Sequence, residues 1–255
     1  LTEAGAQPMS SADGRWVMSY NGEVYNAEQV AAEPHMGGLI RRGTSDTEIV
    51  LESIARIGLE RTLEKLNGMF AIALWDRKTR TLHLIRDRLG IKPLAYVKAN
   101  DGLWFASELK AFVAVGLTLT VDPSATATFL RFACVPAPYS IYHEVKKLKP
   151  GEIVSVTATG QVTRQQYWSA GAVAQAGLAA PFAGSEADAE EQLHALLADA
   201  VAGQMVSDVP LGVFLSGGVD SSTVAALMVA SKRSRVRTFS IGFSDLDYDE
   251  SSYAR

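Results

Sequence analysis

The sequence predicts two domains of different class: an α+β domain built on layered antiparallel β-sheet, followed by the start of a parallel-sheet α/β domain. Short apolar segments separated by turn residues fill the first two thirds of the chain, and such strands pair as antiparallel hairpins. After them come a strand, a glycine loop, a helix and a second strand. That order is typical of a βαβ unit and implies parallel strands.

The first domain, residues 1–168, is expected to consist mainly of strands. Residues 16–20 form the first strand candidate. Residues 21–26 are expected as the turn after it, because Asn-Gly is the strongest short-range hairpin signal. The nearly continuous apolar run at 69–75 indicates a strand buried on both faces. Further strands are expected at 81–85, 94–97, 103–106, 152–156 and 161–167.

One helix is expected inside the first domain, at residues 46–57, where four apolar residues recur at the spacing of a helix face. Ser45 precedes it as a candidate N-cap residue. Glu48 follows three residues later, which is the pattern of a capping box.

The second domain is expected at residues 185–255, after an Ala- and Gly-rich stretch at 169–184 that indicates a linker. Apolar spacing predicts a helix at 187–205. A buried strand at 211–215, a helix at 219–231 and a strand at 236–243 complete the expected βαβ unit.

Composition excludes several classes of protein. A net charge of −4 without a basic stripe argues against a nucleic-acid partner. No apolar run is long enough to span a membrane, and no signal segment opens the chain. A single cysteine cannot form an internal disulfide, which fits the cytoplasm. The four histidines lack zinc-ligand spacing. Because the chain starts at Leu1 and ends after an acidic loop, we expect an interior fragment of a longer polypeptide.

The segment at 216–222, SGGVDSS, is expected to bind a phosphate chain. Its glycines let backbone amides approach phosphate oxygens, and the following helix N-terminus favours negative charge. Asp220 would repel phosphate unless it holds Mg²⁺, which bridges carboxylate and phosphates. The alternative is a glycine turn whose polar residues only cap the helix. The predicted ATP-binding residues of this loop are Ser216, Gly217, Gly218, Asp220, Ser221 and Ser222.

This segment resembles the signature S-G-G-x-D-S-S of the N-type ATP pyrophosphatases, whose domain has an adenine-nucleotide α-hydrolase-like fold. The resemblance implies cleavage of ATP to AMP and pyrophosphate. It also implies that Leu215 and Ile241, at the ends of the two strands, border the adenine. The alternative for these two residues is plain sheet core.

Further stretches resemble class II glutamine amidotransferases, which have an Ntn-type fold, and together they are similar to glutamine-hydrolysing asparagine synthetases. The stretches are AGAQPM at 4–9, YNGEVYN at 20–26, TSDTE at 44–48, LNGMFAIALWD at 66–76, RDRLGIKPLAY at 86–96, ASELKAF at 106–112, SDVPLGVFLSGGVDSS at 207–222 and TFSIGFSDLDYDES at 238–251. The stretch at 86–96 is expected to have a structural role.

This resemblance implies a role for four residues in glutamine binding and hydrolysis. The Asn21 side chain and the Gly22 amide would form the oxyanion hole. Glu23 and Asp46 would bind the α-ammonium group of glutamine, with Asn21 also in contact with the substrate. The alternatives are a hairpin turn for Asn21 and Gly22, and a dipole-stabilised helix start for Asp46.

The chain departs from the family pattern at both ends. The family's nucleophile is a cysteine at the start of the processed chain, and its carboxylate-binding arginine follows shortly after. Neither is present here, and the aspartate-binding part of the synthetase would follow Arg255. Cys134 is expected to be a small buried thiol rather than a substitute nucleophile. The fragment by itself is therefore expected to be inactive.

The resemblance implies a carbon–nitrogen ligase that takes glutamine, aspartate and ATP as substrates. Ammonia from glutamine would attack a β-aspartyl-adenylate, giving asparagine, AMP and pyrophosphate. Two alternatives stay open: a related amidotransferase acting on another carboxylate such as a sugar acid, and a non-catalytic vestigial module. The sequence leaves open whether the protein is a monomer or a homodimer.

Overall fold

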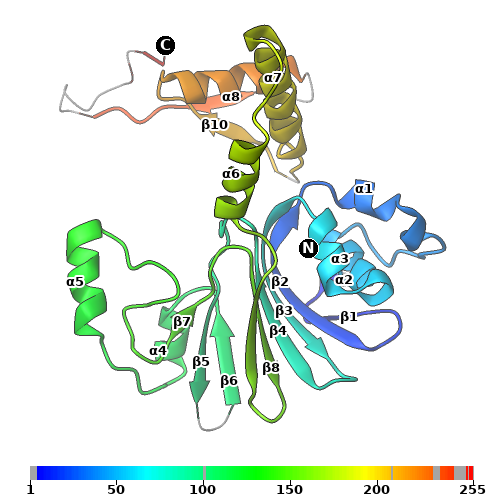
Figure 1. Ribbon diagram of the computed structural model, residues 1–255, viewed down its shortest axis with the longest axis vertical. Helices are drawn as coiled ribbons and strands as arrows, with labels where there is room; N and C mark the ends of the chain where they lie inside the picture. The colour runs from blue at the N-terminus through cyan, green and yellow to red at the C-terminus, as the bar shows by residue number, and fades with distance from the viewer. Residues whose placement is uncertain are drawn as a thin grey trace. The chain divides into compact units, whose positions relative to one another are not determined.

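The computed structural model describes residues 5–99, 102–207, 209–231, 236–243, 251 and 253–254. They form two compact units, divided between Leu178 and Ala179 (Figure 1). This division falls within the stretch for which a linker is predicted, and the predicted domain limits stay a prediction. Ala4, Asp208 and residues 244–250, which belong to three of the matching stretches, lie outside the described residues.

Unit 1 contains two antiparallel sheets. The larger sheet has six strands in the order β1-β2-β3-β4-β8-β9 and the smaller has three in the order β6-β5-β7. The larger sheet comprises β1 (Met9–Ser10), β2 (Trp16–Val24), β3 (Gly68–Asp76), β4 (Thr81–Arg86), β8 (Glu152–Thr157) and β9 (Val162–Gln166). The smaller comprises β5 (Ala95–Ala99), β6 (Gly102–Ala106) and β7 (Lys146–Lys147). The predicted layered antiparallel domain is confirmed.

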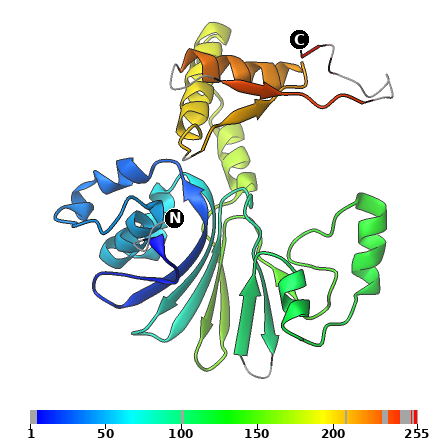
Figure 2. The ribbon, with the colours of Figure 1, turned by 180° about the vertical axis from the view of Figure 1, so that it is seen from behind.

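Two cores lie on opposite faces of the larger sheet, because side chains of a strand alternate between its faces. Phe70, Ile72 and Leu74 of β3 pack with helices α2 (Asp46–Ile57) and α3 (Leu59–Lys65). Ala71 and Ala73 face the smaller sheet and share a core with it. Helices α2 and α3, the larger sheet and the smaller sheet therefore follow one another in that order (Figure 2). Helix α4 (Lys110–Ala114) packs on the far face of the smaller sheet through Phe112.

The predicted turn at residues 21–26 is wrong in its first four positions. Strand β2 continues through Val24, and Asn21 and Gly22 pair with Ala71 and Phe70 of β3. The hairpin reading of Asn-Gly fails because a nine-residue partner strand is available along this whole segment. Pairing with β3 satisfies the odd-numbered amides of β2, which a turn would leave exposed.

Helix α2 has the predicted bounds and the predicted N-cap, since the Ser45 side chain accepts a hydrogen bond from the Thr47 amide. The predicted capping box is wrong. Glu48 turns back instead to the preceding loop, where its carboxylate accepts hydrogen bonds from the Arg42 and Gly43 amides and from Arg42 Nε. A charged partner and two loop amides compete successfully with the single amide of the N-cap residue.

Several short helices have no counterpart in the sequence prediction. They are α1 (Ala27–Ala31), the 3₁₀ helix η2 (Pro34–Met36), α3 (Leu59–Lys65), α4 (Lys110–Ala114), α5 (Pro123–Phe132) and α6 (Ala170–Ala179). Helix α6 occupies most of the predicted linker and buries none of its residues. Its alanines favour a helix by intrinsic propensity alone, which a search for apolar periodicity does not detect.

Unit 2 contains α7 (Glu186–Gly203), β10 (Gly212–Phe214), α8 (Val219–Ala230) and β11 (Arg237–Phe239). Strands β10 and β11 are parallel, with Val213 opposite Thr238, so the predicted βαβ unit is confirmed. The predicted burial of residues 211–215 is wrong: Phe214 is 74% exposed. The described residues of this unit provide only two strands, which leaves much of the sheet surface uncovered. In the described part of the chain no helix is long and apolar enough to cross a membrane.

Candidate active site

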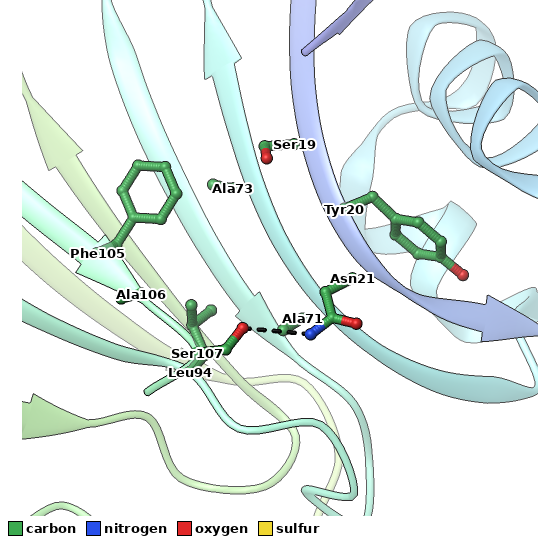
Figure 3. Close-up of a pocket in the computed structure, with 9 residues that line it drawn as sticks. All are labelled: Ser19, Tyr20, Asn21, Ala71, Ala73, Leu94, Phe105, Ala106 and Ser107. Atoms are coloured by element: carbon green, nitrogen blue, oxygen red, sulfur yellow. Dashed lines mark hydrogen bonds between the residues drawn. The ribbon is translucent and has the colours of Figure 1, made fainter. Parts of the chain in front are cut away.

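A cavity of about 220 Å³ opens between the two sheets of unit 1 (Figure 3). Asn21 and Ser19 project into it from β2, and Ala71 and Ala73 of β3 form its floor. The small alanine side chains leave room that larger residues would fill. Tyr20, Leu94, Phe105, Ala106 and Ser107 complete the lining.

The Gly22 amide lies at the edge of β2 away from β3, next in sequence to the cavity-lining Asn21. Odd-numbered residues of β2 bond to β3, as the adjoining Tyr25 N to Asn67 O bond of 2.8 Å shows. Even-numbered amides face the other edge, where Tyr20 N donates to Gln7 Oε1 and Val24 N donates to Asp46 Oδ2. Gly22 N lies between these two, and none of the described residues accepts a hydrogen bond from it.

Only glycine fits at position 22. A Cβ atom there would lie 2.3 Å from the Met69 carbonyl oxygen and 2.7 Å from Phe70 Cα. A larger residue would therefore push β2 away from β3 and shift the amide. The close approach of the two strands fixes the direction of the Gly22 N–H bond.

Asp46 reaches the same edge of β2 from the first turn of α2. Its Oδ2 atom accepts hydrogen bonds from Tyr20 Oη at 2.8 Å and from Val24 N at 2.9 Å. Burial raises the pKa of Tyr20, and the negative charges of Asp46 and Glu23 raise it further, so the phenol stays a donor. The four predicted glutamine-site residues are thus gathered on β2 and the adjoining helix start.

The loop after β4 has a structural role, as predicted. The Asp87 side chain is fully buried and its two oxygens accept hydrogen bonds from four amides, those of Phe70, Leu89, Ile91 and Lys92. Arg86 donates to three carbonyl groups, those of Gly90, Lys92 and Leu148. Burial lowers the pKa of Arg86, with the Asp87 charge opposing that shift.

In unit 2 the predicted phosphate loop connects β10 to α8 and is not part of a continuous helix. Gly217 has φ +81°, a conformation that other residues rarely adopt. Ser216 Oγ and Ser221 Oγ are 3.0 Å apart, and Ser216 Oγ accepts from Gly218 N at 3.4 Å. Asp220 and Ser222 lie in the first turn of α8, where the Asp220 side chain is exposed.

The two residues predicted to border adenine flank the strand ends. Leu215 N donates to Phe239 O at 2.8 Å, which extends the pairing of β10 with β11 by one residue. Ile241 is 64% exposed. Ile241 is therefore not a buried residue of the sheet core, which was the alternative interpretation.

A family model described as "Glutamine amidotransferase domain" matches residues 1–168, well over half of the chain. The chain belongs to the glutamine amidotransferase domain family. A second family model, described as "Asparagine synthase", matches residues 192–255 of this amidotransferase-family chain.

Among the relatives of the amidotransferase chain is asparagine synthetase [glutamine-hydrolyzing] 1 of Bacillus subtilis, which is 33% identical over 253 residues. The match covers 99% of this chain and 39% of that protein. Amidase chry2 of Gibberella zeae is 32% identical, with 89% of this chain and 33% of that protein covered. The chain thus spans about two fifths or less of the length of these relatives.

A solved structure of glutamine phosphoribosylpyrophosphate amidotransferase from Bacillus subtilis, complexed with ADP and GMP, is 18% identical. The superposition has a TM-score of 0.48 and covers 91% of this chain and 48% of that chain.

The only cysteine of the amidotransferase chain does not lie where it was predicted. Cys134 is exposed, two residues beyond the end of α5, and is absent from the cavity lining. The apolar stretch around it indicated burial, but α5 buries only Ala125, and Phe129 and Phe132 are more than half exposed. Among the described residues, no group of three or more His, Cys, Asp or Glu side chains could hold a metal ion.

Two residues of the candidate site were not singled out from the sequence. Tyr20 donates to Asp46, and Ser107 Oγ accepts a hydrogen bond from Asn21 Nδ2 at 3.2 Å. Both occur in the matching stretches YNGEVYN and ASELKAF, which was the available signal. Their contacts join residues 26 and 86 positions apart, which no local pattern reveals.

Proposed function

We propose that the amidotransferase domain binds glutamine in the cavity beside β2 and stabilises the oxyanion that forms when its amide is hydrolysed. The observation that carries this proposal is the available Gly22 amide, next to the Asn21 side chain that projects into the cavity. Two fixed N–H donors on neighbouring residues are what an oxyanion hole requires. A strand that holds Gly22 by close packing keeps one of them in a constant direction.

In this proposal Glu23 and Asp46 bind the α-ammonium group of glutamine. Asp46 already accepts two hydrogen bonds through Oδ2 and one from Thr47 N through Oδ1, so its carboxylate is held in place. An ionised carboxylate has about four acceptor positions, which leaves one for the substrate. Glu23, on the next odd position of β2 after Asn21, lies on the same face of the sheet.

The nucleophile in the proposed hydrolysis is the thiol of an N-terminal cysteine, as the resemblance to class II amidotransferases implies. Its attack on the glutamine amide carbon forms the oxyanion, and collapse of that intermediate releases ammonia. The exposed Cys134 is not part of the cavity lining and is not the nucleophile. The residues described here supply substrate binding and charge stabilisation.

We further propose that the loop at 215–222 binds ATP and that the released ammonia attacks a β-aspartyl-adenylate, giving asparagine, AMP and pyrophosphate. The strand–loop–helix arrangement with a left-handed Gly217 supports phosphate binding. The exposed Asp220 carboxylate and nearby serine hydroxyls are oxygen donors of the kind Mg²⁺ prefers. When bound, Mg²⁺ would neutralise phosphate charge at Asp220. Use of ATP and a lone cysteine fit the cytoplasm.

The chain is also similar to a relative that is not named an asparagine synthetase, amidase chry2. We therefore keep a second candidate function, in which the same scaffold transfers ammonia to a different carboxylate. Incubating the complete gene product with glutamine, ATP and aspartate separates the two. Formation of AMP that depends on aspartate supports asparagine synthesis. AMP formation that is independent of aspartate and depends on another carboxylic acid supports the second candidate function.

The glutamine site is tested by Asn21→Ala in the complete gene product, with glutaminase activity as the measurement. Loss of one oxyanion donor is expected to lower kcat by about 10²–10³-fold with little change in KM, because the donor acts mainly in the transition state. Ser124→Ala, an exposed position of α5 that is absent from the cavity lining, is the control. Wild-type kcat in Asn21→Ala would refute the site.

A further inference from the structure

The Asn21 side chain has a single recorded hydrogen-bond partner among the described residues. Its Nδ2 atom donates to Ser107 Oγ at 3.2 Å, across the cavity from β2 to the residue that follows β6 (Figure 3). Ser107 lies on the side of the cavity formed by the smaller sheet, and Asn21 lies on a strand of the larger sheet. The contact therefore joins the two layers at the site.

A side-chain amide carries two N–H bonds in one plane. When one of them is held by Ser107 Oγ, the plane of the amide is fixed and the second N–H is directed elsewhere. Asn21 is exposed, so packing alone does not hold its terminal torsion angle, which is broad for asparagine. The hydroxyl of Ser107 supplies the restraint that packing does not.

The position of Ser107 is itself well fixed. The adjoining residue, Ala106, pairs with Ala95 of β5, which is 2% exposed. Ala106 also packs against a core cluster that contains the fully buried Phe112. A rigid strand end is therefore available to hold the hydroxyl at a constant place.

We infer that Ser107 is a positioning residue for the oxyanion hole: it orients the Asn21 amide so that the second Nδ2–H points to the place where negative charge develops. This inference rests on the proposed glutaminase function. Ser107 does not act on the substrate, and its whole effect is transmitted through Asn21. Pre-orientation removes the need to order the amide during the reaction.

The inference predicts a specific kinetic signature for Ser107→Ala in the complete gene product. Restoring the rotational freedom of one side chain is expected to lower glutaminase kcat by about two- to tenfold. KM for glutamine stays at the wild-type value, because the oriented donor matters in the transition state and not in the ground state. Ser107→Thr keeps the hydroxyl and restores kcat.

A double-mutant cycle distinguishes positioning from an independent role. If Ser107 acts only through Asn21, the double variant Asn21→Ala with Ser107→Ala is as slow as Asn21→Ala alone. Ser124→Ala, an exposed serine of α5 that is absent from the cavity lining, keeps the wild-type rate and serves as the control. A double variant slowed by the product of the two single effects would overturn the positioning role.

The outcomes also separate this inference from the function on which it rests. Ser107→Ala at the wild-type rate, with Asn21→Ala slow, overturns the inference and leaves the oxyanion hole standing. Asn21→Ala at the wild-type rate overturns the proposed site and the inference together. A Ser107→Ala variant with a raised KM and a wild-type kcat has a lowered kcat/KM. That result indicates a substrate-binding role and also overturns the inference.

Discussion

The Asp87→Ala substitution is expected to destabilise unit 1 strongly. The carboxylate has no exposed surface and accepts hydrogen bonds from four amides: Phe70 N at 3.3 Å, Leu89 N at 3.1 Å, Ile91 N at 2.9 Å and Lys92 N at 2.9 Å. Alanine removes every one of these acceptors. The loop after β4 would lose the group around which it is folded.

The loss of stability depends on which of the four amides can form a hydrogen bond with water once the carboxylate is removed. Leu89 and Ile91 are 67% and 54% exposed, so their amides can be solvated at little cost. Phe70 is 2% exposed and Lys92 is half-buried. Leaving a buried donor unsatisfied costs about 1–3 kcal/mol, so these two give a loss of about 2–6 kcal/mol in the free energy of unfolding. That is a large part of the about 5–15 kcal/mol typical of a folded protein.

Thermal unfolding of this chain followed by circular dichroism measures the effect. Asp13→Ala is the matched control, because the exposed Asp13 carboxylate accepts hydrogen bonds from Ser11 Oγ and Arg15 N that water can replace. The control is expected to change stability by less than about 0.5 kcal/mol. Equal melting temperatures for Asp87→Ala and Asp13→Ala would refute the assignment of Asp87 as the organising acceptor of the loop.

Three further predictions address packing, pH and nucleotide binding. Gly22→Ala forces β2 and β3 apart and is expected to lower the free energy of unfolding by about 1–3 kcal/mol or more. The control, Gly177→Ala in the exposed helix α6, is expected to stabilise the chain slightly. Equal melting temperatures for the two variants would contradict the close approach of the strands. The hydrogen bond from Arg15 holds the pKa of Asp76 well below its ordinary value of 3.8, so its contribution to stability is present above that pH and is lost as the pH falls further. Stability of Asp76→Asn is therefore expected to fall less than that of the wild type between about pH 5 and pH 2, and identical pH profiles would rule out this linkage. Asp220→Ala in the complete gene product is expected to abolish pyrophosphate release from ATP and to spare glutaminase activity; full synthetase turnover would exclude Asp220 as a metal ligand.

Local patterns in the sequence predict some elements well and miss others for identifiable reasons. Helix α2 was predicted with its observed bounds, because its apolar spacing and its N-cap serine are both local. The strand around Asn21 was cut short because a local turn signal was overridden by pairing with β3. A second glycine contributes to that pairing: a Cβ on Gly68 would lie 2.3 Å from the Glu23 carbonyl oxygen. Gly22 pairs with Phe70 and Gly68 pairs with Val24, so the close approach depends on two glycines 46 residues apart that cannot be recognised from either segment alone.

In the candidate site, too, some features were predicted from the sequence and others were not. Resemblance to a family implies a role for Asn21, Gly22 and Asp46, which lie on β2 and at the start of α2, where Asp46 accepts a hydrogen bond from Val24 N of β2. What resemblance did not supply is the set of contacts that hold them, from Tyr20 and Ser107. Such contacts depend on the register of the strands and on the packing of the two sheets. Burial of Cys134 was misjudged because apolar neighbours on α5 need a partner surface, which the described residues do not provide.

Neighbouring residues of strand β3 have different structural roles because their side chains lie on opposite faces of the sheet. Phe70, Ile72 and Leu74 anchor the helices, while Ala71 and Ala73, interleaved with them, shape the hollow on the opposite side. A change at either alanine would alter the cavity and the core shared with the smaller sheet, while the core on the helix side keeps its own residues. The shape of the cavity and the packing of the helices therefore depend on alternate positions of one short strand.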